Sequence, residues 1–182
     1  PFVKRHEFVE YVNTLYDTEK PFMFDKNNDG ILDSIVQIGN NTQARVFTYT
    51  PSQNAWLEDS NFSLVSASRI WANLIAPLWA DRDGDGQEDM LVISPSNIYG
   101  SYKDTAIYHY NSTTGVWTFD TDFETAINAA GLVDLPLTAP PQWINMDGIW
   151  SAETLYLPGT SRTYIFSWDG TSWTTETDLA TL

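Results

Sequence analysis

The sequence of 182 residues contains no cysteine. Disulfide bonds and thiolate metal sites are therefore excluded, so the hydrophobic core and any bound ions must supply the stability of the fold. Histidine is nearly absent as well. Only His6 and His109 are present, which disfavours a zinc site. The missing thiols do not argue against secretion.

Basic residues are also scarce. Lysine and arginine total 9, aspartate and glutamate total 24, and the formal net charge is −15. This balance argues against nucleic acid or an anionic membrane surface as the main partner, because both would be repelled. No apolar run approaches the ~20 residues that span a bilayer, so we expect no membrane insertion. The chain has no signal peptide and begins with Pro1 instead of methionine, so we expect a mature or partial chain.

Sequence motifs of common enzymes are missing. There is no cysteine nucleophile, no G-x-S-x-G turn and no glycine-rich phosphate loop. His109 lies between Tyr108 and Tyr110 in a strand-like run, so we expect it to pack or to lie on the surface rather than act as a base. The sequence therefore predicts a protein that is not an enzyme.

The composition that remains is typical of a packed β protein. Hydrophobic residues make up 42% and aromatic residues 14%, which excludes a disordered chain. Threonine, serine, asparagine, tryptophan and tyrosine are frequent, and they favour strands and polar turns over long surface helices. We predict the all-β class.

Three copies of one unit organise the sequence. Each copy has a nine-residue polar loop, and these loops (25–33, 81–89 and 145–153) start 56 and then 64 residues apart. Every loop is followed by two short strand-like runs rich in β-branched and aromatic residues, then by a turn and a tryptophan. The strand-like runs are 34–38 and 45–49, 90–93 and 106–110, and 154–157 and 164–168, and the closing tryptophans are Trp56, Trp117 and Trp173.

These repeats predict β-propeller-like blades of antiparallel strands, because a unit this small must stack on its neighbours to bury its apolar faces. We divide the chain into an N-terminal strand or extension (1–20) and three repeats (21–75, 76–139 and 140–182). Three blades do not close a ring. The chain is therefore a fragment, is completed by other chains, or forms an open array. Thr121 to Glu124 resembles a capping box and predicts a helix of at most two turns.

The first two loops contain the candidate metal ligands. They read DKNNDGILD and DRDGDGQED, with acidic or amide oxygens at loop positions 1, 3, 5 and 9 and glycine at position 6. Calcium accepts six to eight such oxygens, and glycine permits the tight turn. We predict two Ca²⁺ sites with side-chain ligands and, at position 7, a backbone carbonyl. The predicted ligands are Asp25, Asn27, Asp29, Ile31 and Asp33 in the first loop and Asp81, Asp83, Asp85, Gln87 and Asp89 in the second.

The alternatives for these loops are magnesium and an EF-hand. Magnesium is the lesser candidate because it demands strict octahedral geometry and retains its waters. An EF-hand needs glutamate at position 12, where this sequence has Val36 and Val92 inside strand-like runs. In the third loop Asn145, Asp147 and Glu153 hold positions 1, 3 and 9, but Ile149 and Trp150 replace the acid and the glycine at positions 5 and 6. We predict weak or absent metal binding in that loop.

The two DxNxDG and DxDxDG loops and the strand after each resemble the FG-GAP/VCBS-type repeats of integrin α-chain propellers and of many secreted propellers. The resemblance covers about residues 20–177. It implies a β-propeller-like fold, structural calcium, and a role in adhesion or in the recognition of glycans and proteins. The literal Phe-Gly and Gly-Ala-Pro elements are absent, which places the chain among looser relatives.

We expect an extracellular, cell-surface location and a structural or adhesive role. The partners expected are other protein chains, through self-association or within a larger parent assembly such as a filament. The alternative is a carbohydrate-binding propeller. Aromatic residues that recur in register are expected to pack between repeats, so the candidate ligand surface lies at aromatic residues outside that register: Trp71, Tyr99, Tyr102 and Trp150. Three candidate glycosylation sequons begin at Asn40, Asn61 and Asn111.

Overall fold

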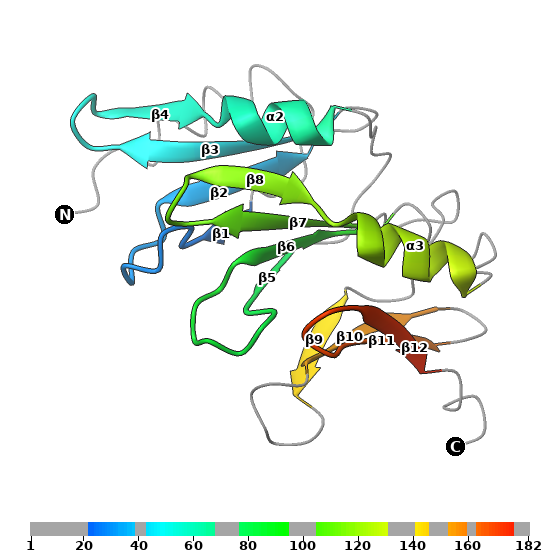
Figure 1. The fold of residues 1–182 in the computed structure, drawn as a ribbon. Coiled ribbons are helices and arrows are strands. Elements are labelled where there is room, and N and C mark those ends of the chain that lie inside the picture. Colours follow the sequence, from blue (N-terminus) through cyan, green and yellow to red (C-terminus); the bar gives the residue numbers. More distant parts are fainter. Residues whose placement is uncertain are drawn as a thin grey trace.

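The computed structural model describes residues 22–38, 43–67, 77–94, 105–130, 141–145, 153–159 and 163–176. In these segments twelve strands form three four-stranded antiparallel sheets, accompanied by two short helices (Figure 1). The predicted all-β class is confirmed at this level. Neither described helix is long and apolar enough to cross a membrane.

Each sheet is a meander in which every strand pairs with the next strand of the chain. The first sheet contains β1 (Phe22–Phe24), β2 (Ser34–Ile38), β3 (Ala44–Thr50) and β4 (Ala55–Glu58). The second contains β5 (Leu78–Ala80), β6 (Met90–Ile93), β7 (Ala106–Asn111) and β8 (Val116–Phe119). The third contains β9 (Gln142–Asn145), β10 (Glu153–Pro158), β11 (Thr163–Trp168) and β12 (Trp173–Glu176). All six strand-like runs predicted from the sequence lie within these strands.

The second sheet is the middle layer, and the burial of its residues reflects this position. All four residues of β6 are buried, which is the pattern of a strand covered on both faces. Because side chains alternate along a strand, Leu91 and Ile93 pack toward the first sheet while Met90 and Val92 pack toward the third. The apolar run at 90–93 is therefore shared between two cores.

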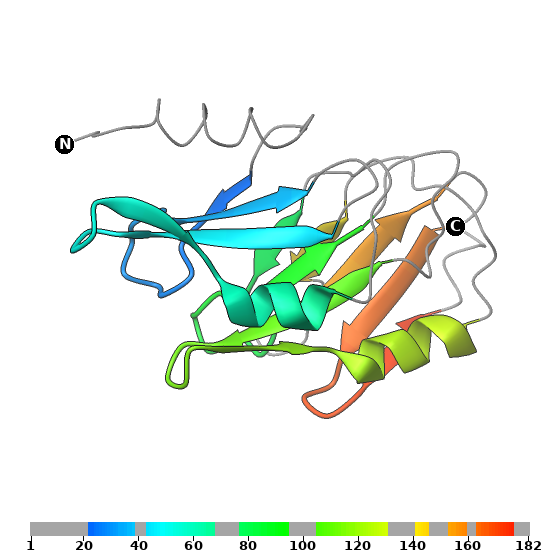
Figure 2. The ribbon, with the colours of Figure 1, turned by 90° about the horizontal axis from the view of Figure 1, so that it is seen from above.

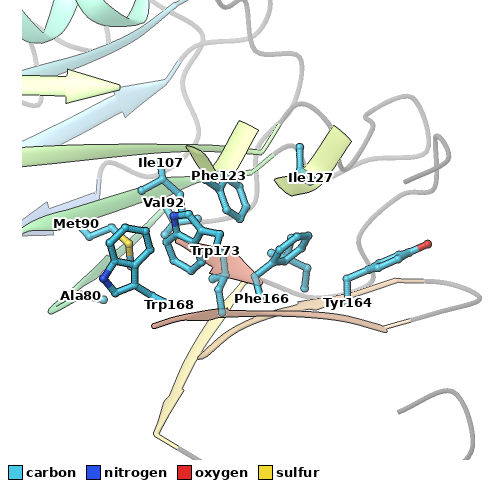
Figure 3. Packing of buried hydrophobic residues seen from close by; sticks show 12 residues of the cluster. Ala80, Met90, Val92, Ile107, Phe123, Ile127, Tyr164, Phe166, Trp168 and Trp173 are labelled. Carbon is cyan, nitrogen blue, oxygen red and sulfur yellow. The ribbon is translucent and has the colours of Figure 1, made fainter. Parts of the chain in front are cut away.

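Aromatic rings dominate both cores. Between the first and second sheets, Trp117 lies within ring contact of Phe24, Phe62 and Trp79, at centroid distances of 6.4, 5.0 and 5.9 Å. Figure 3 shows the second core, where residues of the middle sheet and of the following helix face four aromatic residues of the third sheet. These four residues are Tyr164, Phe166, Trp168 and Trp173. The expectation that recurring aromatic residues pack between repeats is confirmed for Trp79, Trp117, Trp168 and Trp173.

Each helix begins at an aspartate that directly follows the fourth strand of a sheet. Asp59 caps α2 (Ser60–Ser66), which packs against β3 and β8, and Asp120 caps α3 (Thr121–Ala129), which packs against β7 and β12. The prediction of a helix near Thr121 is confirmed. Its details were wrong, because the cap is Asp120 and the nine residues exceed two turns. Helix α2 was not predicted.

Candidate metal centre

The two acidic loops join the first and second strands of their sheets. Loop 25–33 connects β1 to β2, and loop 81–89 connects β5 to β6. Both lie at the same end of the stacked sheets (Figure 2). A strand begins directly after each loop, at Ser34 and at Met90. An EF-hand would continue into a helix there, so the structure excludes an EF-hand at both loops.

The second loop gathers three carboxylates. Asp81, Asp83 and Asp85 each offer an oxygen within 4.8 Å of the others, and this is the only such acidic group in the part of the chain that the structure describes. Backbone N–H groups hold the side chains in place, because Asp81 accepts from Gly84 and Gly86, both at 2.7 Å. The two glycines have φ of +74° and +88°, a conformation that L side chains rarely adopt. The glycines therefore let the loop fold back over Asp81.

Asp89, the predicted ligand at position 9, lies outside that group. Its carboxylate accepts a hydrogen bond from the backbone N–H of Arg82 at 3.3 Å. Its backbone N–H donates to Ala80 at 3.0 Å, and its carbonyl accepts from Tyr110 at 2.8 Å. Burial raises the pKa of Asp89, and the nearby Arg82 and His109 counteract that rise. Hydrogen bonds thus hold Asp89 to the sheet, outside the group formed by Asp81, Asp83 and Asp85.

The first loop has the same turn but a different side-chain arrangement. Gly30, with φ of +85°, donates to Asp25 at 2.6 Å, as Gly86 does to Asp81. Asn27 places its Nδ2 atom 3.2 Å from Asp29 and 3.4 Å from Asp33. The amide thus directs a donor toward the carboxylates, whereas a metal ligand would present its oxygen. In this arrangement the Asn27 amide, by its hydrogen bonds, links the carboxylates of Asp29 and Asp33.

Hydrogen bonds join the two loops directly. The side chain of Asn28 donates to the backbone carbonyl of Glu88 and accepts from its N–H, both at 3.0 Å. Asn28 has φ of +57°, which asparagine tolerates better than most residues. The equivalent position of the second loop is Gly84, which has no side chain to make such a bond. The paired loops therefore form one acidic end of the molecule.

The donor chemistry of this end fits a hard divalent cation. Carboxylate oxygens are the ligands that calcium prefers, and three of them this close repel one another unless a cation neutralises them. Burial raises the pKa of Asp33, and repulsion from Asp29 and Asp25 raises it further. Burial also raises the pKa of Glu88, with added repulsion from Asp25 and Asp81. A bound Ca²⁺ would supply charge neutralisation there and would fix the loop.

The predicted backbone ligands, Ile31 and Gln87, lie at exposed points of their loops. The Ile31 side chain is 64% exposed, so it contributes nothing to the core and is free to turn outward. The N–H groups of Ile31 and Gln87 donate to Asp29 at 2.9 Å and to Asp85 at 2.7 Å. The use of their carbonyls as metal ligands stays a prediction.

Several predicted positions lie outside the described residues. These are the segment 1–20, the sequon at Asn40, the third-loop residues Asp147, Ile149 and Trp150, and the candidate ligand surface of Trp71, Tyr99 and Tyr102. The other two sequons are described. Asn61 is in α2, where its Oδ1 atom accepts from the backbone N–H of Trp117, and Asn111 ends β7, exposed, and accepts from Thr114 at 2.8 Å.

Sequence reasoning missed the second residue of each loop. The side chains of Lys26 and Arg82 lie at the contact with the next sheet, where each also lies close to a helix-capping aspartate. A signal was present, since both are basic residues at the same loop position in an acidic chain. That signal marks the two positions but does not show which residues the side chains contact.

The raised pKa values make a prediction for the cation-free protein. Because the folded state holds protons on Asp33, Glu88 and Asp89 more tightly than the unfolded chain does, stability should fall as pH rises from about 4, the unfolded value, through the raised folded pKa values. Urea unfolding in the presence of a chelator across this range measures it. Asp33→Asn should reduce the slope. A free energy of unfolding that climbs steadily over the same range would contradict the raised pKa values.

Comparison of the chain with family models, with curated proteins and with solved structures finds no significant match. The resemblance to FG-GAP/VCBS-type repeats therefore stays a prediction that rests on the two loops and the strands that follow them. The role of the acidic end must be argued from its own residues.

Proposed function

We propose that the chain is an extracellular calcium-binding repeat protein with a structural or adhesive role, built from FG-GAP/VCBS-type, propeller-like blades. The observation that carries the proposal is the group formed by Asp81, Asp83 and Asp85 in a loop closed by two glycines at positive φ. Oxygen-only donors in this arrangement suit calcium. The first loop binds a second ion once Asn27 turns its oxygen inward.

The acidic loops are placed to act structurally. Each connects two strands of a sheet and carries hydrogen bonds to the neighbouring sheet, so an ion bound there would stiffen the stack. The meander sheets are layered in series, an arrangement to which further sheets of the same kind can be added (Figure 1). We therefore propose other protein chains as partners, through self-association or within a larger surface assembly.

Calcium is expected to raise the melting temperature by mass action. At a calcium concentration of 100 times the dissociation constant, one site adds about 2.7 kcal/mol to the free energy of unfolding. Asp85→Ala should remove most of the contribution of the second loop, whereas Asp147→Ala in the degenerate third loop should change it little. Differential scanning calorimetry with calcium or a chelator measures this directly.

The matched control is Asp169→Ala. Asp169 lies in the exposed turn between β11 and β12, where hydrogen bonds from Ser172 and Thr171 lower its pKa to about 2. Its removal deletes one negative charge from a turn that belongs to neither acidic loop and should leave the calcium-induced shift intact. Equal and negligible shifts in the unmodified protein and in Asp85→Ala would rule the site out.

A further inference from the structure

Two interfaces join the three sheets, and the same contacts recur in both. We call them the first joint, between the first and second sheets, and the second joint, between the second and third. In each joint a residue of the acidic loop, the aspartate that caps a helix, and two aromatic residues of the following sheet come together. The repetition at equivalent positions indicates a common device.

In the first joint the shared acceptor is Asp59. Lys26, at loop position 2, donates to its Oδ2 atom at 3.1 Å, and Trp117 of the second sheet donates its indole N–H to the same atom at 3.0 Å. The Lys26 ammonium also lies 4.9 Å from the ring centre of Tyr110 in the second sheet. Lys26 thus links its own loop to Tyr110 directly and to Trp117 through the shared acceptor Asp59.

In the second joint Asp120 has the same place. Trp173 of the third sheet donates its indole N–H to Oδ2 at 2.8 Å, and Arg82, at loop position 2, lies 3.9 Å from that oxygen. The Arg82 guanidinium stacks over Trp168 at 4.5 Å from the ring centre. His109 donates to Asp120 as well, at 2.7 Å. The side chains of Arg82 and Asp120 are both largely buried.

Loop position 1 makes a second contact with the sheet that follows. The indole N–H of Trp79 donates to the backbone carbonyl of Asp25 at 3.1 Å, and that of Trp143 donates to the carbonyl of Asp81 at 3.0 Å. Position 1 therefore contributes its carboxylate to the acidic loop and its carbonyl to the next sheet. Any shift of the loop backbone at this residue must move an atom on which the next sheet is docked.

We infer that cation binding by each acidic loop is coupled to the docking of the sheet that follows it. This inference rests on the proposed calcium binding. Neutralising the crowded carboxylates fixes the backbone at positions 1 and 2, and these two positions hold the contacts to the next sheet. By thermodynamic reciprocity, a well-docked third sheet in turn strengthens cation binding by the second loop.

The test removes a docking hydrogen bond without changing any charge. In an Asp29→Ala background, which disables the first loop, a calorimetric titration with calcium reports the second loop alone. Trp173→Phe keeps a ring in the core but deletes the donor to Asp120, and it should raise the dissociation constant about fivefold or more. Trp117→Phe makes the same deletion in the first joint and should leave the constant within about twofold.

A second variant tests the coupling independently, in case Trp173→Phe does not fold. Trp143→Phe keeps an aromatic ring but deletes the hydrogen bond to the Asp81 carbonyl, and it should also weaken calcium binding about fivefold. If Trp173→Phe and Trp143→Phe lower the melting temperature but leave the dissociation constant unchanged, the joints are merely structural and the coupling is wrong. If the unmodified protein takes up no calcium, the proposed function fails and the coupling with it. The two failures are thus distinct.

Discussion

Replacing Trp117 by alanine is expected to lower the free energy of unfolding by about 3–5 kcal/mol, which is the usual range for loss of a large buried aromatic side chain. Trp117 is 1% exposed and is the largest fully buried side chain described. Its ring contacts aromatic residues of both sheets, and its N–H satisfies Asp59. Alanine would leave a cavity at the centre of the first joint and a carboxylate with one fewer donor.

Urea unfolding followed by circular dichroism measures this loss, and two variants calibrate it. Trp117→Phe retains much of the ring packing and should lose clearly less than Trp117→Ala. Val116→Ala, one residue earlier on β8, removes a side chain that is 42% exposed and should change stability by less than about 0.5 kcal/mol. Similar losses for Val116→Ala and Trp117→Ala would contradict the packing of the first joint.

Most strands could be predicted from the sequence because their signals are local. The β-branched and aromatic residues in 45–49 and the breaker residues around 51–54 mark a hairpin whatever lies nearby. Helix α2 could not be predicted this way. Its seven residues include three serines and a valine, which are weak helix formers, so it depends on its Asp59 cap and on burial of Phe62. Such a helix is stable only when it packs against a sheet.

The candidate metal site likewise has one part that the sequence predicts and another that it does not. Loop spacing alone places Asp81, Asp83 and Asp85 together, because each is two residues from the next in a tight turn. It does not fix how the amide of Asn27 turns, since that orientation depends on side chains up to six residues away. The joints were beyond reach of any local pattern, because Lys26 meets Asp59 across 33 residues and Asp59 meets Trp117 across 58.

The second joint depends on Asp120 as the first depends on Trp117. Asp120 is 6% exposed and accepts hydrogen bonds from the Phe123 N–H at 2.7 Å, from His109 and from Trp173. Asp120→Ala would remove the cap of α3, leave the buried Trp173 indole without its acceptor, and leave the partly buried Arg82 without its neighbouring carboxylate. Loss of a helix cap costs about 1 kcal/mol, and a buried hydrogen-bond donor left without its acceptor costs about 1–3 kcal/mol, so we expect a loss of about 2–4 kcal/mol.

The pH dependence separates this carboxylate from a simple packing residue. Burial alone would raise the pKa of Asp120, but hydrogen bonds from His109, the Phe123 N–H and Trp173 outweigh it and the pKa is lowered. Since the folded pKa lies below the unfolded value of about 4, its stabilisation is complete above that pH and is lost as pH falls through the folded pKa. The stability difference between the unmodified protein and Asp120→Asn should therefore shrink below about pH 4. A difference that stays constant from pH 7 to pH 2 would mean that the charge of Asp120 contributes nothing to the joint.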